Sequence, residues 1–293
     1  MPGAPARVWV AVVAGLAAIG ISPILIRYAG DAPALTLAAW RTGAVTLAAA
    51  PLALRAPERA ELAAFTARDW GLVGCAGVFL GGHFMTWIVS VQLTSVASAS
   101  VLVTMSPIFI AVLGALVLKE RPSRRLVAAI GVAVVGAAFI GLSEDASGTY
   151  PNPALGNALA LGAALLVSVY LLIGRAVRQR TSLWTYFFPL NAVACATCLA
   201  CCLAAGVPLA LSPPVAVLAV AMGLGPGLVG HGSFTYALAY LPAALIGLLS
   251  LGEPIIASVA ALVLFGETPA ALAVVGMAVV LAAIAAVVTS REG

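Results

Sequence analysis

An internal repeat constrains this chain more than any other feature of its sequence. The run from Pro107 to Pro122 returns 147 residues later, from Pro254 to Pro269, with five of sixteen positions identical. Each copy begins with a proline inside an apolar run and ends with Glu-x-Pro. A repeat of this kind indicates that the chain consists of two related halves.

The composition indicates a membrane protein with several spans. Of the 293 residues, 63% are hydrophobic and only 8% are charged, and the mean hydropathy is +1.15. A soluble domain carries about 25% charged residues, so this chain has too few to cover a water-facing surface. The net charge of +4 reflects the loops of such a protein and does not indicate a nucleic-acid partner.

Ten apolar stretches are long enough to cross a hydrocarbon core, which takes about 20 residues. They are residues 8–28, 33–54, 70–90, 95–118, 125–142, 154–174, 184–206, 214–240, 243–265 and 270–289. We therefore predict an all-α membrane protein with ten transmembrane helices in two five-helix repeats. The first repeat is residues 1–142, an external linker is residues 143–153, and the second repeat is residues 154–293.

The basic residues predict the orientation of these spans. If the N-terminus is cytoplasmic, twelve basic residues fall on the inner side and only Arg27 falls on the outer side, while Arg41 lies within a span. This asymmetry follows the positive-inside rule. It places both termini in the cytoplasm and the protein in the cell (inner) membrane. Because five is an odd number of spans, the second half then enters the membrane upside down relative to the first.

Several short motifs, taken in order, resemble those of the EamA-type transporters of the drug/metabolite transporter superfamily. They are Pro33 with Trp40-Arg41, the run Leu93–Ala99, Pro107-Ile108-Phe109, the stop Glu120–Ser123, Gly131 with Gly136, and in the second half Tyr240, Pro254, Glu267 and Gly276. The resemblance covers nearly the whole chain. It implies ten helices in two inverted repeats and alternating-access movement of small metabolites, and it does not specify which metabolite.

Glu253 and Arg41 are the principal candidate site residues, because an ionisable group at membrane depth is costly and commonly functional. A rise of 1.5 Å per residue places both near the middle of their spans. An ion pair between them is therefore compatible with their depth. Glu253 precedes Pro254, and a proline within a span frees a backbone carbonyl one turn earlier. Pro107 is expected to break the helix at the equivalent place in the first half.

Each of these two residues also has a structural interpretation. Glu253 binds a proton or a cationic group, or it is a neutral hydrogen-bonded acid or a static partner of Arg41. For Arg41, substrate contact competes with a role in helix packing and topology. Ser106 stands in the first half where Glu253 stands in the second, so the repeat is chemically asymmetric.

Aromatic and imidazole side chains form the second group of candidates for substrate binding. His83 and Trp87 lie one helical turn apart, and His231 occupies nearly the equivalent place in the second half. Tyr170 is a further candidate. These side chains either line a cavity or serve as hydrogen-bonded packing residues.

Other motifs carry less chemistry. Cys195, Cys198, Cys201 and Cys202 lack His, Asp or Glu nearby, so we interpret them as packing residues and predict no metal site. Gly225–Gly230 matches G-x-G-x-x-G but lies within a predicted span rather than after a strand. Glu58 and Glu61 are expected to be solvated loop charges. We predict no cofactor, and any use of ATP would require a separate chain.

The sequence therefore predicts a secondary active transporter that exports small metabolites such as amino acids. Substrate would bind near the membrane midplane between the repeats, and transport would be coupled to protons or driven by the substrate gradient. One alternative is an uncoupled facilitator of metabolites or drug-like cations. Alternatives from other classes are a membrane sensor or scaffold that does not transport, and a lipid-modifying enzyme, for which grouped acid, base or metal residues are lacking.

Overall fold

The computed structural model describes residues 4–94, 96–119, 122–142, 150–265 and 270–288, and the regular structure within them is helical. The first half contains α1 (Ala6–Gly20), α2 (Ser22–Tyr28), α3 (Ala34–Ala53), α4 (Ala56–Ala63), α5 (Ala67–Leu93), α6 (Val96–Val103), α7 (Ser106–Leu113), η1 (Gly114–Leu118) and α8 (Arg124–Leu142). The second half contains α9 (Pro153–Arg178), α10 (Leu183–Ala204), α11 (Pro213–Met222), η2 (Gly223–His231), α12 (Gly232–Ala237), α13 (Ala243–Ser250), α14 (Glu253–Phe265) and α15 (Ala271–Val288).

Some sequence predictions concern residues outside these ranges. They are the predicted motif residues Ser95, Glu120, Arg121 and Glu267, the basic residue Arg291, and residues 143–149 of the predicted linker.

Long apolar helices make this a membrane protein with several spans. In the described ranges, seven helical stretches are long and apolar enough to cross a membrane, and an eighth is added if α3 and α4, which meet at a bend of 102°, form one span. The predicted spans 125–142 and 270–289 correspond to α8 and α15. The structure thus confirms an all-helical membrane protein, while the count of ten spans stays a prediction.

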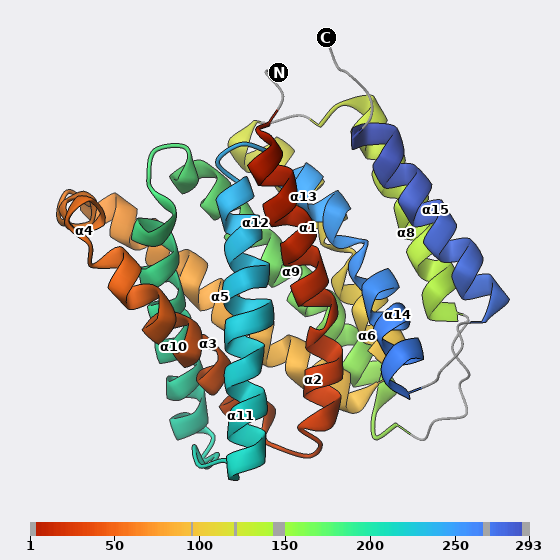
Figure 1. Ribbon diagram of the computed structural model, residues 1–293, viewed down its shortest axis with the longest axis horizontal. Helices are drawn as coiled ribbons and strands as arrows, with labels where there is room; N and C mark the ends of the chain where they lie inside the picture. The colour runs from red at the N-terminus through yellow and green to blue at the C-terminus, as the bar shows by residue number, and fades with distance from the viewer. Residues whose placement is uncertain (1–3, 95, 120–121, 143–149, 266–269, 289–293) are drawn as a thin grey trace.

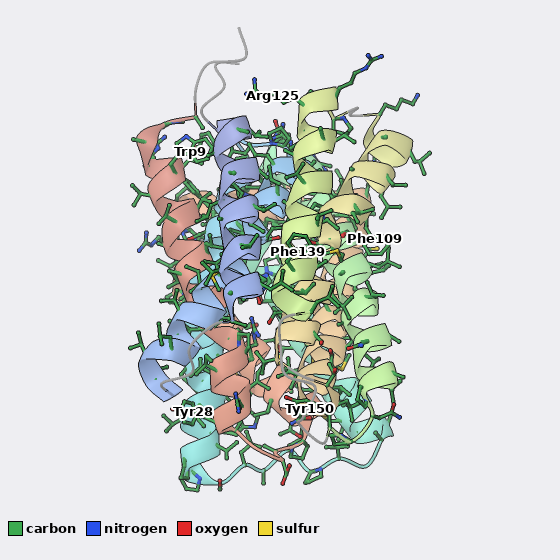
Figure 2. The ribbon with its side chains drawn as sticks, turned by 90° about the vertical axis from the view of Figure 1, so that its right-hand side faces the viewer. Trp9, Tyr28, Phe109, Arg125, Phe139 and Tyr150 are labelled. Atoms are coloured by element: carbon green, nitrogen blue, oxygen red, sulfur yellow. The ribbon has the colours of Figure 1, made fainter. Side chains whose placement is uncertain are left out.

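The two halves of the chain begin at opposite ends of the molecule. α1 begins and α15 ends at the same end (Figure 1). Figure 2 shows Trp9, near the start of α1, at one end, and Tyr150, just before α9, at the other. The first helices of the two halves therefore run in opposite directions, as an inverted repeat requires.

Helix packing relates the two halves pair by pair. α5 lies along α9, α10 packs against α3 and α5, and α8 lies along α15. Glycines permit the closest approaches: a Cβ added at Gly77 would lie 2.6 Å from Cβ of Val193, and one added at Gly136 would lie 2.8 Å from the carbonyl oxygen of Gly276. Small residues at such crossings are a common packing device between membrane helices.

Two of the helical interruptions lie at the prolines of the internal repeat. One interruption separates α6 from α7 immediately before Ser106 and Pro107, and the other separates α13 from α14 immediately before Glu253 and Pro254. Each proline lies in the first turn of the helix that follows, where its missing N–H removes no intrahelical bond. The interruptions place Ser106 and Glu253 at the starts of two half-length helices.

A polar network joins the two halves at the end where α4 lies. The Glu61 carboxylate accepts hydrogen bonds from the backbone N–H of Ser182, at 2.9 and 3.1 Å, and from the Thr185 hydroxyl, at 2.7 Å. Nearby, Arg180 forms an ion pair with Asp69. Our expectation that Glu61 is a solvated loop charge was therefore wrong. Its partners are 121 and 124 residues away in the sequence, so only the tertiary fold brings them within reach.

Candidate functional site

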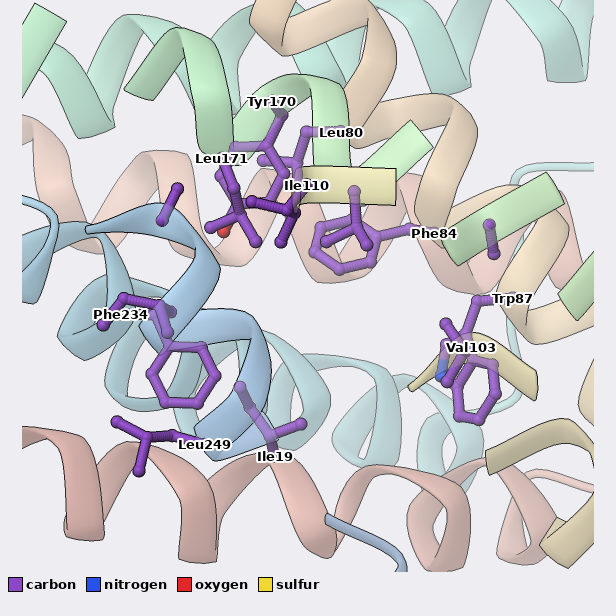
Figure 3. Close-up of a cluster of buried hydrophobic side chains, with 14 of the residues drawn as sticks. Ile19, Leu80, Phe84, Trp87, Val103, Ile110, Tyr170, Leu171, Phe234 and Leu249 are labelled. Carbon is purple, nitrogen blue, oxygen red and sulfur yellow. The ribbon is translucent and has the colours of Figure 1, made fainter. Parts of the chain in front are cut away.

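A cavity lies between the two halves of the chain. Sixteen residues line it, eight from each half, and its empty volume is about 580 Å³, including the opening. Figure 3 shows part of its apolar wall, formed by Ile19, Trp87, Val103, Leu171 and Phe234. Substrate sites of inverted-repeat transporters commonly lie at the interface between the repeats.

All six residues predicted for binding or coupling line this one cavity and are buried. Each is brought in by a different element, except for two that share α5. They are Arg41 on α3, His83 and Trp87 on α5, Tyr170 on α9, His231 at the end of η2 and Glu253 at the start of α14. The structure thus gathers residues that lie up to 212 positions apart in the sequence.

Arg41 is a buried cation held by uncharged neighbours. Its side chain is 1% exposed. Nη1 donates a hydrogen bond to the Ser22 hydroxyl at 3.2 Å, and the guanidinium carbon lies 4.0 Å from the centroid of the Phe84 ring. Nε has no hydrogen-bond partner among the described residues. The guanidinium is therefore oriented from two directions without being neutralised.

Glu253 is the acidic residue of the cavity. It is 6% exposed and is the first residue of α14, directly after the interruption that separates α13 from α14. Within the described chain, Glu253 and Arg41 do not form an ion pair within 4.0 Å, although both line the cavity. The carboxyl group is thus placed at a helix break, in a cavity, near a cation that it does not contact.

The two histidines are held in defined orientations. Nδ1 of His83 lies 2.9 Å from the carbonyl oxygen of Ala163, and because a carbonyl only accepts, this nitrogen carries the proton. Nδ1 of His231 is hydrogen-bonded to the Tyr170 hydroxyl at 3.1 Å. The imidazole rings lie edge to face, with centroids 5.9 Å apart. Each ring therefore uses one nitrogen for positioning and keeps the other for further contacts.

Comparison with known proteins agrees with this architecture. The model of the EamA-like transporter family matches residues 7–142 and, a second time, residues 154–289. The chain belongs to the EamA-like transporter family. It is accordingly a membrane transporter built from two EamA repeats, and it is not an enzyme. A search of curated proteins finds no match.

The fold of this EamA-like protein also resembles a solved one. A crystal structure of a protein superposes with a TM-score of 0.75 and covers 97% of each chain, at 18% sequence identity. At that identity the likeness concerns the fold. The family match confirms the resemblance expected from the sequence, whereas the exact boundaries of the repeats and of the linker at 143–153 stay predictions.

The two EamA repeats differ in chemistry at their helix interruptions. The carbonyl oxygen of Ser106, in the first repeat, accepts a hydrogen bond from the Ser168 hydroxyl at 3.1 Å. The equivalent place in the second repeat carries Glu253. At the first interruption, the Ser168 hydroxyl therefore makes an uncharged contact. At the second interruption, Glu253 places a titratable carboxyl group at the cavity.

A glycine-rich π-helix positions His231 in the second EamA repeat. A Cβ added at Gly223 would lie 2.6 Å from the carbonyl oxygen of Arg41, and one added at Gly230 would lie 2.5 Å from the Ile19 side chain. Within the Gly225–Gly230 motif, a Cβ added at Gly227 would lie 2.6 Å from the Val45 side chain, so Gly227 and Gly230 allow η2 to pack closely against α3 and α1. π-Helical segments are frequent at functional sites, and this one ends at a cavity residue.

Sequence reasoning missed several residues that position the side chains of the cavity, one of which, Ser22, also lines it. Ser22 and Phe84 hold Arg41, and Ser168 supports the Ser106 break. The cysteines of α10 act in packing: the Cys195 and Cys198 thiols lie 3.6 and 3.8 Å from the carbonyl oxygens of Ala39 and Gly81. None of these contacts has a sequence signal, because each depends on which spans become neighbours.

Proposed function

We propose that this protein is a secondary active transporter that moves small metabolites such as amino acids through the cavity between its repeats. It works by alternating access and acts as an exporter in the cell (inner) membrane, with both termini in the cytoplasm. The observation that carries the proposal is the convergence of Glu253, Arg41, His83, His231 and Tyr170 on one buried cavity. A packing role alone does not require two charged groups and two imidazoles to face the same space.

Glu253 is the coupling residue in this proposal. A carboxyl group at a helix break can bind a proton when the cavity faces one side of the membrane and release it to the other side. A cationic group of the substrate competes with that proton for the carboxylate. Each exported substrate molecule is then exchanged for a proton that enters the cell.

Each remaining cavity residue has a role in binding. Trp87 offers an apolar surface, while His83 and the Tyr170–His231 pair offer directed hydrogen bonds. Pro107 and Pro254 mark the two interruptions, where the half-length helices can change their relative angle. Such broken helices are a recurring feature of the binding sites of secondary transporters.

Counterflow in liposomes tests the proposal. Purified protein is reconstituted, loaded with one unlabelled amino acid at a time, and assayed for accumulation of the same labelled amino acid. We expect at least one small amino acid or related metabolite to show counterflow above that of protein-free vesicles. Correct insertion without counterflow across a broad panel would count against transport of this class.

The same assay separates coupled from uncoupled transport. An imposed proton gradient should drive net flux of the identified substrate against its own gradient. Flux that only ever dissipates the substrate gradient would favour the uncoupled facilitator, and thermal stabilisation by a metabolite without flux would favour a sensor.

A further inference from the structure

Among the residues that the structure describes, Arg41 has no anionic partner in direct contact. A charge at membrane depth costs at least about 2.5–3.5 kcal/mol, and pairing is the usual way in which that cost is offset. The guanidinium donates a hydrogen bond to the Ser22 hydroxyl and lies over the face of the Phe84 ring, and neither group carries a charge. Glu253 shares the cavity but does not reach it. The site therefore presents an oriented, uncompensated cation to the cavity.

We propose that Arg41, Ser22 and Phe84 form a binding subsite for a carboxylate-type anion, the anionic group of the transported molecule. The proposal rests on the proposed function and adds the chemistry of one end of the substrate. A guanidinium is planar, and two of its N–H groups can donate parallel hydrogen bonds to the two oxygens of a carboxylate. A guanidinium that is already held in place loses little conformational freedom when it binds such an anion. Ser22 holds the guanidinium at one amino group, and the face of the Phe84 ring lies 4.0 Å from its central carbon.

Phe84 is the positioning residue of this subsite. It is 1% exposed and is not among the residues that line the cavity, so it acts through its neighbours. One contact is with Arg41. The other is with His231, whose ring lies edge to face with that of Phe84 at a centroid distance of 5.0 Å and an angle of 89°. One ring thus orients both the cation and the imidazole that Tyr170 holds.

This arrangement gives the cavity two charged groups that bind different parts of a substrate. The Arg41 subsite takes the anionic group, and Glu253, on a different helix, remains available for a proton or a cationic group. Arg41 belongs to the first repeat and Glu253 to the second. Removing the charge of Glu253 should therefore leave anion binding intact, and removing Phe84 should weaken it although no charge is lost.

Acetate is the probe that tests the subsite without knowledge of the natural substrate. The purified, detergent-solubilised protein is titrated with sodium acetate at pH 7.5, with sodium chloride at equal ionic strength and acetamide as references, and thermal unfolding gives the apparent Kd. We expect acetate to stabilise the protein and acetamide, which has the same shape and no charge, to have no effect. Arg41→Gln should abolish the acetate effect.

Variants of the supporting residues provide the decisive comparison. Phe84→Leu should weaken acetate binding about tenfold, because the cation–π contact is lost and the guanidinium is released. Phe84→Trp should retain binding. Phe187→Leu is the matched control, since Phe187 is equally buried but does not line the cavity, and its ring packs against that of Trp184. Glu253→Gln should bind acetate at least as tightly as the parent protein.

The proposal is overturned if acetate behaves like chloride or acetamide, or if Phe84→Leu binds acetate with the parent affinity. Loss of acetate binding in Glu253→Gln would also overturn it. If Arg41→Gln fails to fold, Phe84→Leu and Ser22→Ala, which should weaken binding severalfold, still decide the matter. Acetate binding in a protein without counterflow would instead count against the proposed transport, so the two failures are distinguishable.

Discussion

Arg41 and Glu253 face one cavity from opposite repeats, and in the described chain no ion pair joins them. A contacting pair would hold Glu253 ionised and would remove both groups from substrate binding. In the mechanism that we propose, their separation leaves the carboxyl group available to exchange a proton and the guanidinium available to bind an anion. We therefore expect the separation of Arg41 and Glu253 to matter for transport.

Glu253→Gln should abolish the pH dependence of net flux. Glutamine mimics the protonated acid permanently, so it cannot carry a proton across. In the parent protein, acidification of the external side should increase export, because external protons then load Glu253 more completely. The variant should not respond in proteoliposomes assayed between about pH 5.5 and 8, because its side chain neither binds nor releases a proton.

Glu61→Gln is the control for this experiment. Glu61 is partly buried as well, but its carboxylate serves the start of α10 and does not line the cavity. Its variant should keep the parental pH response. An unchanged pH response in Glu253→Gln would remove Glu253 from the coupling mechanism.

Tyr170→Phe should lower the transport rate about fivefold while the protein inserts normally. The substitution removes the hydroxyl that is bonded to His231, and a hydrogen bond of this kind contributes about 1 kcal/mol. The initial rate of counterflow is the measurement. Tyr150→Phe, at an exposed tyrosine outside the helices, should transport at the parent rate. Equal rates for both variants would show that the Tyr170–His231 bond is not used in transport.

His83→Asn should be better tolerated than His83→Leu. An asparagine amide can donate to the Ala163 carbonyl from nearly the position of the imidazole Nδ1, whereas leucine cannot. We expect the leucine variant to lose about 1 kcal/mol more stability than the asparagine variant, as measured by thermal unfolding in detergent. If the two variants unfold at the same temperature, the bond between α5 and α9 contributes nothing to stability.

Gly136→Ala should destabilise the protein by about 1–3 kcal/mol, because the added methyl group would overlap the carbonyl oxygen of Gly276 at 2.8 Å. Gly131→Ala is the matched control on the same helix. A Cβ at Gly131 meets nothing within 4 Å, so this substitution should be neutral or slightly stabilising. The unfolding temperatures of the two variants, compared in one detergent, check the prediction. A similar shift in both would contradict the close crossing of α8 and α15.

Much of the site was predictable because intramembrane ionisable groups are rare. Only a few such residues exist in the chain, and each of those singled out lies at the cavity. The helix interruptions expected at Pro107 and Pro254 likewise lie directly before these prolines, whereas Pro51 and Pro189 stand inside continuous helices. These predictions are local, because a single ionisable residue or proline within one apolar run is sufficient to make them.

The contacts that organise the site were not predictable in the same way. Phe84 is one of nine phenylalanines, and nothing in the sequence distinguishes the one that lies below Arg41. Glu61 looked like a loop charge, because its partners at Ser182 and Thr185 lie beyond the linker. Such contacts depend on how spans pack laterally, and apolar periodicity does not encode which spans are neighbours.

The pairing of α8 with α15 has a mechanical consequence. These are the last helices of the two repeats, and in addition to the crossing at Gly136 an Arg125 side chain on α8 donates a hydrogen bond to the Ala286 carbonyl on α15. Within the described chain, neither helix contributes a residue to the cavity, and the pair stands at one side of the molecule (Figure 1). In the alternating access that we propose, we expect this pair to keep the two halves attached to each other while the cavity between them opens first to one side of the membrane and then to the other.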